Sequence, residues 1–468
     1  MKKNRIISTI ILAIAVIVSI SCAHYPKNES LPRYDAAKGY RYPSPEETGS
    51  RDHLFVALAF SGGGTRAAAF SYGVLKELYL TPLPDNTNRT MLEEVDVISS
   101  VSGGSFTAAY YGLFKERVFE DFESRFLYRD IQGELGKLLF SPENWIKLSS
   151  PYFNRVDMAA EHYNETLFDK QTFQHLENQG CRPYIAINAT NMTTGAQFTF
   201  TQNQFDLIGS DLSRFPVARA VAASSAFPFL LSPVSLVNHP DPAGYELPID
   251  IKNGLKDFGI NDRRYFWAKN RAEYQINKSE HPYLHLMDGG LSDNLGIRYI
   301  LDQYSRASGY IFQRKSKIRK LVIILVNAKT EKSQNLDRSE TSPRIGDVAH
   351  KTATVSMDNY SFETVQVARD QLKASITARK NIDACQELID THCNNGYEIP
   401  PMGHSFDVYF IDINFLKVKD PLLRKRLLSL PTSFSLKRDE VNDLIETGMK
   451  LLRESQKFKE LLKDLMAR

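Results

Sequence analysis

The stretch at residues 54–64 reads LFVALAFSGGG and gives the first indication of the fold. A run of apolar residues that is stopped by a serine and three glycines is typical of a buried strand ending in a tight turn. Residues 67–79 then have the composition of a helix. Because strand, glycine turn and helix follow one another directly, we expect an α/β unit here.

A second unit of the same kind follows. Residues 95–99 are strand-like, Ser102 and two glycines supply a turn, and residues 105–114 again indicate a helix. Further strands are predicted at residues 184–189, 197–201, 283–287, 321–326 and 408–413. Strands that alternate with helices predict a three-layer α/β/α core around a mostly parallel sheet.

Polar stretches with aromatic residues interrupt this alternation at residues 116–179 and 237–280. We interpret both as helical or loop excursions, and they are candidates for a substrate lid. Residues 343–381 and, more clearly, 435–468 are predicted to be helical, since apolar residues of the last stretch are spaced for one face. We expect that last helix to pack on the core, with a membrane-surface role as the alternative.

The composition narrows the class of protein. The 468 residues are 42% hydrophobic and 24% charged, which is typical of a globular protein with one large domain or two. The formal net charge is only +3, so nothing indicates a nucleic-acid partner. Cysteine and histidine residues lack the spacing of a zinc site, and no metal is predicted.

The N-terminus has the pattern of an export signal. Lys2, Lys3 and Arg5 precede an aliphatic run at residues 6–21, which ends at Cys22. The run is shorter than the roughly 20 residues that a transmembrane helix needs, so a retained anchor is only an alternative. The signal resembles that of a bacterial lipoprotein. This resemblance implies lipidation of Cys22 and a place in the outer membrane of the cell envelope.

Ordinary signal cleavage, giving a periplasmic or secreted protein, is the other alternative. Residues 23–52 are rich in Pro, Tyr, Ser and charge, and we expect a flexible tether there. Cys181, Cys385 and Cys393 follow in the body of the chain. A disulfide between Cys385 and Cys393 and unpaired thiols in packing positions are both compatible with an oxidising compartment.

Three sequence elements carry residue types suited to ester hydrolysis at a serine, which needs a nucleophile, a base and donors for the oxyanion. The first is Ser102, between a predicted strand and helix, where small neighbours allow the sharp turn of a nucleophile elbow. Ser100 stands where the usual elbow has glycine. A Gly/Ser-rich helix start is therefore the alternative interpretation.

The second element is the loop Gly62, Gly63 and Gly64, whose backbone N–H groups can form an anion-binding nest. An oxyanion hole and a phosphate cradle are both uses of such a nest, although the Lys-Ser/Thr of a P-loop is missing. The third element is Asp288, followed by two glycines, at the end of a predicted strand. In a parallel sheet its carboxylate would reach the same edge as Ser102. Asp-Gly-Gly alone also fits an ordinary turn.

In this order, the glycine loop, the elbow and the Asp-Gly-Gly turn resemble the motifs of the patatin-like phospholipases. Residues 218–233 (ARAVAASSAFPFLLSP) are similar to the alanine- and serine-rich segment of that family. Residues 290–294 are similar to its Gly-Leu-x-x-Asn continuation. The resemblance covers residues 53–330 and implies a patatin-like core.

The resemblance implies a Ser–Asp dyad, with Ser102 as nucleophile and Asp288 as base, and no cofactor. It also implies that Gly62, Gly63 and Gly64 donate to the oxyanion. Arg66 would lie nearby, either supporting the oxyanion or bracing the loop.

His281 and His285 invite a triad instead of a dyad. A strand alternates its faces, however, so we expect His285 to point away from Asp288.

We therefore expect a signal at residues 1–22, the tether at 23–52, a catalytic domain at 53–330 and a largely helical C-terminal extension at 331–468. The predicted function is hydrolysis of phospholipid acyl esters at a membrane surface through an acyl-serine intermediate. Lysophospholipase, carboxylesterase or acyltransferase activity with the same dyad is an alternative. An inactive lipoprotein scaffold is an alternative of another class. No protein partner is predicted.

Overall fold

The computed structural model describes residues 27–43, 53–84, 88–180, 182–228, 230–256, 263–331, 340–392 and 406–466. Within these residues a central sheet has the strand order β10-β9-β2-β3-β4-β8-β7, with β5 paired to β4. The strands are β2 Leu54–Phe60, β3 Val95–Val101, β4 Tyr184–Asn191, β5 Gln197–Thr199, β7 Val234–Val237, β8 Tyr283–Asp288, β9 Lys320–Asn327 and β10 Asp407–Asn414. A separate small sheet pairs β1 (Glu29–Ser30) with β6 (Ser210–Asp211).

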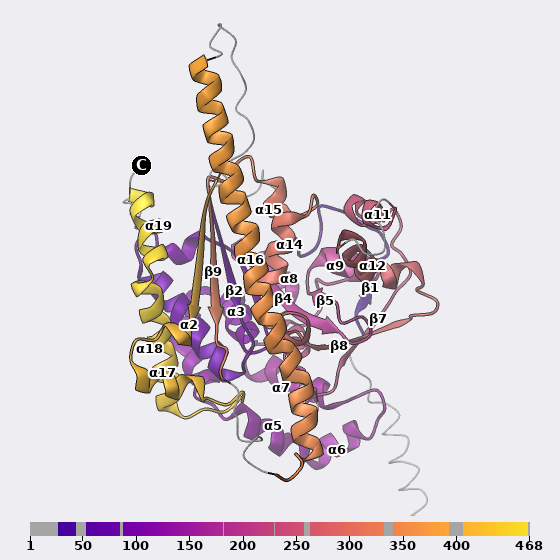
Figure 1. Ribbon diagram of the computed structural model, residues 1–468. Coiled ribbons are helices and arrows are strands. Elements are labelled where there is room, and N and C mark those ends of the chain that lie inside the picture. The colour runs from indigo at the N-terminus through magenta and orange to yellow at the C-terminus, as the bar shows by residue number, and fades with distance from the viewer. Residues whose placement is uncertain are drawn as a thin grey trace, which may run out of the picture.

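Helices lie on both sides of the sheet, as Figure 1 shows, and this confirms the expected α/β fold class. The longer ones are α2 Thr65–Leu80, α3 Gly103–Phe114, α7 Arg155–Thr166, α12 Arg263–Ile276, α14 Ile297–Ser305, α16 Ile345–His392, α18 Arg438–Glu454 and α19 Gln456–Met466. The shorter ones are α4 Val118–Phe122, α5 Ile131–Leu139, α6 Pro142–Leu148, α8 Phe173–Asn178, α9 Gln202–Leu207, α10 Val217–Ser224, α11 Ile249–Lys256, α13 Gly290–Asp293, α15 Tyr310–Gln313 and α17 Pro421–Leu428. Short helical turns occur at Met91–Glu94, Lys115–Arg117, Glu123–Leu127 and Phe415–Lys417.

The sheet is mostly parallel, as expected, but its β8 edge is not. Strands β10, β9, β2, β3 and β4 run parallel, whereas β8 is antiparallel to β4 and β7 is antiparallel to β8. We expected Asp288 to reach the edge of Ser102 if its strand were parallel to the others, but β8 is antiparallel. Strand β8 instead pairs only with the last three residues of β4, in the register Ala189 with Asp288. Its own carboxyl end consequently still meets the carboxyl edge of the parallel strands.

The C-terminal region is part of the core. Strand β10 adds an edge strand parallel to β9, and α18 packs across α2. Two glycines permit this close packing: a Cβ on Gly73 would lie 2.2 Å from the Ile445 carbonyl oxygen, and one on Gly448 would lie 2.6 Å from that of Phe70. Since α2 packs on the buried face of α18, the side chains of Val441, Leu444, Ile445 and Leu452 belong to the core. The described part of the expected extension is thus packed as part of the same folded body.

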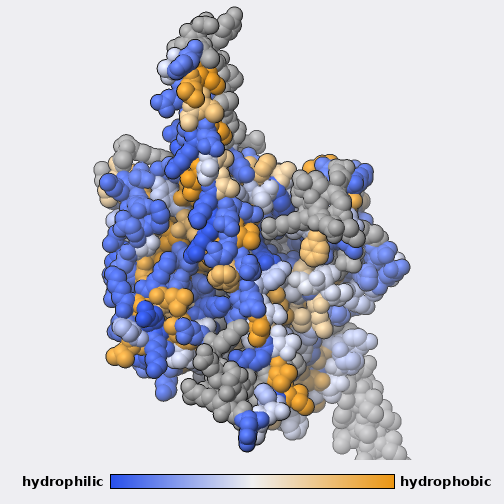
Figure 2. All heavy atoms as spheres, viewed as in Figure 1, coloured by the Kyte–Doolittle hydropathy of each residue, from blue (hydrophilic) through white to orange (hydrophobic). Residues whose placement is uncertain are grey.

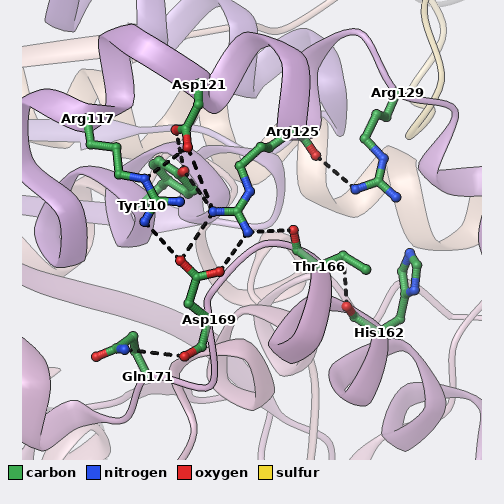
Figure 3. A network of polar contacts seen from close by, with 9 residues as sticks. All are labelled: Tyr110, Arg117, Asp121, Arg125, Arg129, His162, Thr166, Asp169 and Gln171. Carbon is green, nitrogen blue, oxygen red and sulfur yellow. Dashed lines mark hydrogen bonds and ion pairs between the residues drawn. The ribbon is translucent and has the colours of Figure 1, made fainter.

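The first insertion is braced internally by ion pairs, which Figure 3 shows. The Asp169 carboxylate accepts hydrogen bonds from Arg117 at 2.9 Å and from Arg125 at 2.6 Å. Arg117 also binds Asp121, and Arg125 donates to the Thr166 carbonyl oxygen at 3.1 Å. These contacts join the helical turns on either side of α4 to the end of α7 and the loop after it. They favour a fixed part of the body over the substrate lid that we considered.

The second insertion forms a small cluster of its own. Its helices α11 and α12 bury Ile251, Ala268 and Ala272 together with Leu207 of α9. Because these apolar side chains are buried against one another, this insertion packs as a small cluster and not as a loose loop.

The N-terminal segment differs from the flexible tether that we expected. Residues 27–43 run along the body, where Tyr40 is buried and stacks on Tyr184 with ring centroids 4.7 Å apart. Arg41 forms an ion pair with the buried Asp206 at 2.7 Å. The tyrosines that suggested a solvated linker therefore dock in apolar surroundings. The predicted signal at residues 1–22, including Cys22, lies outside the described residues.

Helix α16 is the longest in the described part of the chain and crosses the whole molecule in Figure 1. Figure 2 shows a mostly hydrophilic face along it, with its last turns extending beyond the body. Cys385 lies exposed near that end, whereas Cys181 and Cys393 lie outside the described residues, so the disulfide stays a prediction. Among the described residues no helix is long and apolar enough to cross a bilayer.

Candidate active site

Ser102 lies in a strained turn between β3 and α3. Its backbone has φ 49° and ψ −119°, a conformation that residues other than glycine rarely adopt. Gly103 must be glycine because a Cβ there would lie 2.0 Å from the Gly64 carbonyl oxygen. The turn therefore has the geometry expected of a nucleophile elbow, and α3 begins directly after it. The positive end of the helix dipole points at this position.

Asp288 lies beside Ser102 at the end of β8 and is 3% exposed. Its carboxyl group accepts a hydrogen bond from the Gly290 N–H at 2.8 Å. Burial raises the pKa of Asp288 to about 7, and the Gly290 N–H and the nearby Ser102 side chain only partly oppose that rise. The structure thus brings together the two residues predicted as a dyad, with a carboxyl group that can exchange a proton near neutral pH.

The glycine loop lies against the elbow. A Cβ on Gly62 would lie 3.3 Å from the Ser102 Cβ, so the loop and the serine are in close contact. The Gly62 N–H donates to the Asn294 carbonyl oxygen at 2.8 Å. Gly62 is therefore already committed to a structural hydrogen bond, which corrects the expectation that all three glycines donate to an oxyanion.

Gly63 and Gly64 have φ values of 142° and 62°, which favour glycine at both positions. Among the described residues neither N–H group has a hydrogen-bond partner. These two groups are thus the donors that the loop can offer to a substrate.

Arg66 is buried behind the loop. Its guanidinium donates to the Ala328 carbonyl oxygen at 2.9 Å, to the Leu430 carbonyl oxygen at 2.7 Å and to Thr432 Oγ1 at 3.1 Å. Burial lowers the pKa of Arg66 to about 10. The three hydrogen bonds hold the start of α2 to β9 and to the C-terminal region, which fits a loop brace better than oxyanion support.

The two histidines near Asp288 in the sequence are both exposed and give no support to a triad. His285 is exposed and its Nδ1 lies 2.9 Å from Ser235 Oγ. Burial alternates along β8, with Leu284, Leu286 and Asp288 buried and His285 on the other face. His281 precedes the strand and is exposed.

Two residues at the site were given no role from the sequence. Asn294 lies between the glycine loop and the Asp-Gly-Gly turn, since its Oδ1 would be 2.3 Å from a Cβ on Gly62 and 2.8 Å from one on Gly290. Met357 comes from α16, and its Cε would be 2.3 Å from the same Gly290 Cβ. Only the similarity of residues 290–294 to a family motif pointed to Asn294, and nothing in the sequence pointed to Met357.

Helix α16 is fastened beside the site by polar contacts. The Arg298 guanidinium lies 3.9 Å from the ring centroid of Tyr360, and its Nε donates to Thr364 Oγ1 at 3.0 Å. Lys329 Nζ donates to the Asp358 carbonyl oxygen at 3.2 Å. These bonds place Met357 against the turn that carries Asp288. In the described part of the chain no group of three His, Cys, Asp or Glu side chains is placed to hold a metal ion.

Two solved structures of other proteins are similar to this chain. Human GIVD cytosolic phospholipase A2 superposes with a TM-score of 0.45 at 14% identity, over 89% of this chain and 63% of that chain. This chain therefore spans less than two thirds of that enzyme's length. VipD from Legionella pneumophila gives a TM-score of 0.27 at 11% identity, over 90% of this chain and 71% of that chain. A search of curated proteins found no match.

The family comparison covers all the motifs described above. Residues 58–301, more than half of the chain, match the model for the patatin-like phospholipases, and they include the glycine loop, Ser102 and Asp288. This chain therefore belongs to the patatin-like phospholipase family.

Proposed function

We propose that this protein is a serine acyl hydrolase that cleaves acyl esters of phospholipids, with Ser102 as nucleophile and Asp288 as general base. Membership of the family supports a lipid-ester hydrolase in general. The observation that supports the dyad is the buried Asp288 carboxyl group, whose pKa burial raises to about 7 and which lies near enough to the Ser102 side chain for that side chain to lower this pKa in part. A base with that pKa can accept a proton at neutral pH and return it within one turnover.

In the proposed reaction, Asp288 takes the hydroxyl proton as Ser102 Oγ attacks the ester carbonyl carbon. The N–H groups of Gly63 and Gly64 stabilise the resulting oxyanion, as does the N-terminal end of α3. The C–O bond to the glycerol oxygen then breaks, and the protonated Asp288 gives its proton to that leaving oxygen. Water next attacks the acyl-serine with Asp288 again as base, which releases the fatty acid and restores Ser102.

The cellular setting that we propose rests on the N-terminal sequence alone. The signal-like residues 1–21 and Cys22 support export and lipidation, and so a place at a membrane surface of the bacterial cell envelope. A Cys22→Ala variant would then lose metabolic labelling with radioactive palmitate and leave the membrane fraction. Labelling that persists in this variant would contradict the proposal.

The decisive experiment measures fatty-acid release from mixed phospholipid vesicles by the protein without its signal. Ser102→Ala and Asp288→Asn should each abolish release. Ser100→Ala is the matched control, because its Oγ makes only a long hydrogen bond of 3.4 Å to the Ala186 carbonyl oxygen. We expect this neighbouring variant to retain activity.

Two results would change the assignment. Folded wild-type protein that releases no fatty acid from phospholipids, lysophospholipids or simple esters would favour the inactive lipoprotein scaffold. Activity only on lysophospholipids or short esters, or acyl transfer to an added alcohol, would keep the dyad and change the substrate class.

A further inference from the structure

Ser224 is the last residue of α10 and is completely buried between the elbow and the Asp-Gly-Gly turn. The Ser102 N–H donates to Ser224 Oγ at 2.8 Å. Ser224 Oγ in turn donates to the Asn188 carbonyl oxygen at 2.6 Å, and Ser105 Oγ lies 3.0 Å away. A single side-chain hydroxyl thus contacts the backbone of the proposed nucleophile.

The hydrogen bonds of this hydroxyl are complete and fix the position of its proton. A serine hydroxyl has one donor and two acceptor lone pairs. Its proton must go to Asn188, because a carbonyl oxygen can only accept. The Ser102 N–H can only donate, so the remaining lone pair accepts the hydroxyl proton of Ser105. No other orientation of the Ser224 hydroxyl satisfies all three buried partners.

The backbone of the same region holds the base. The Gly289 N–H, directly after Asp288, donates to the Ser224 carbonyl oxygen at 3.1 Å. The Asp288 N–H donates to the Ala226 carbonyl oxygen at 3.0 Å. Ser224 therefore bonds the elbow through its side chain and the Asp-Gly-Gly turn through its main chain.

The helix that carries Ser224 is itself fixed. Arg219, one turn earlier on α10, forms an ion pair with Asp157 of α7 at 2.5 Å, and both side chains are buried. A buried pair of this kind restricts how far α10 can move without exposing or separating the charges. Ser224 is thus presented by a rigid support.

The elbow needs such a restraint because a positive φ at a non-glycine residue is unfavourable. A strained backbone of this kind persists only where the surrounding structure holds it. We propose that Ser224 is a positioning residue that holds Ser102 within hydrogen-bond reach of Asp288; this inference rests on the proposed function. The Ser102 N–H is bound to Ser224 and is therefore not free to bind the oxyanion. The N–H groups of Gly63 and Gly64 remain as its donors.

The test compares Ser224→Ala, Ser224→Cys and Ser225→Ala with wild type. Cysteine is close to serine in size but hydrogen-bonds weakly, so Ser224→Cys separates the loss of hydrogen bonds from the loss of volume. Ser225 is the matched control: it is a buried serine next in sequence, and its Oγ bonds Val221 of its own helix at 2.8 Å. The readouts are the rate of Ser102 labelling by a fluorophosphonate and the pH profile of kcat and KM on a soluble short-chain ester.

We expect both Ser224 variants to lose about 10- to 100-fold in labelling rate and in kcat, with KM changed little. The acidic limb of kcat/KM should also move to higher pH, because the Ser102 side chain lowers the pKa of Asp288 and this effect weakens when Ser102 is no longer held in place. Ser225→Ala should behave as wild type. A loss of packing alone would not move the acidic limb.

The outcomes separate this inference from the proposed function. Wild-type protein that is not labelled at Ser102 would overturn both. If wild type is labelled at Ser102 and Ser224→Cys has the same labelling rate and pH profile as wild type, the positioning role alone is overturned. A loss in Ser225→Ala equal to that in the Ser224 variants would also overturn it. If Ser224→Ala does not fold, Ser224→Cys decides the question by the same criteria.

Discussion

Replacing Asp288 by asparagine should make the folded protein more stable at alkaline pH, while abolishing catalysis. Burial raises the pKa of the Asp288 carboxyl from 3.8 to about 7 in the folded protein. The folded state therefore binds this proton more tightly than the unfolded chain does. The stability that protonation contributes is present in full below about pH 4 and is lost as the pH rises through about 7.

The size of the effect follows from the shift. A pKa difference of roughly three units, at 1.36 kcal/mol per unit, corresponds to roughly 4 kcal/mol lost by the wild type above about pH 7. Asparagine has nearly the same shape and no charge, so this loss disappears in Asp288→Asn. Between about pH 5 and pH 8.5, the stability of the variant relative to wild type should rise by roughly 3 kcal/mol.

Urea unfolding of both proteins at these two pH values measures the change directly. The comparison uses the change in the free energy of unfolding between the two pH values. Any pH-independent cost of the asparagine amide cancels in this change. Ser102→Ala is the control, since it is equally inactive but keeps the carboxyl group. Because the Ser102 side chain lowers the pKa of Asp288, this variant should lose at least as much stability as wild type between the two pH values. A wild type and an Asp288→Asn variant with parallel pH profiles would refute a buried carboxyl group with a raised pKa.

Three further predictions follow from the same site. The kcat/KM of wild type on a soluble ester should fall about tenfold per pH unit below about pH 7, since Asp288 must be ionised to act as base; a profile flat to pH 5 would contradict this. Arg66→Met should lower the free energy of unfolding by roughly 3 kcal/mol, because three buried acceptors lose a charged donor, yet change kcat less than about tenfold; the reverse result would assign Arg66 to the oxyanion. Gly103→Ala should abolish fluorophosphonate labelling, because its Cβ would lie 2.0 Å from the Gly64 carbonyl oxygen, whereas Gly136→Ala, with open space around it, should not.

From the sequence we predicted Ser102, Asp288 and the glycine loop as site residues, but not the topology that joins them. The apolar runs of β2 and β9 were recognised because buried parallel strands are continuously apolar. Strand direction leaves no such signal. The prediction for Asp288 was therefore conditional on a parallel sheet. The position of Asp288 at the end of β4 depends instead on a register that no local pattern encodes.

Long-range contacts explain the other differences. Strand β7 has only four residues and follows a proline, and only every second one of its side chains is fully buried. Its pattern was therefore too weak to predict a strand. Tyr40 and its neighbours read as a linker because their apolar partners are distant in sequence. Met357 reaches the site only because α16 is held there by Arg298 and Lys329, contacts that composition cannot reveal.

The most direct test of the dyad identifies the residue that a fluorophosphonate modifies. The folded protein is treated with the probe, digested and analysed by peptide mass spectrometry. The dyad predicts one adduct, on the peptide that contains Ser102, which is absent in Ser102→Ala and strongly reduced in Asp288→Asn. An adduct on another serine, or undiminished labelling of Ser102 in Asp288→Asn, would contradict a Ser102–Asp288 dyad.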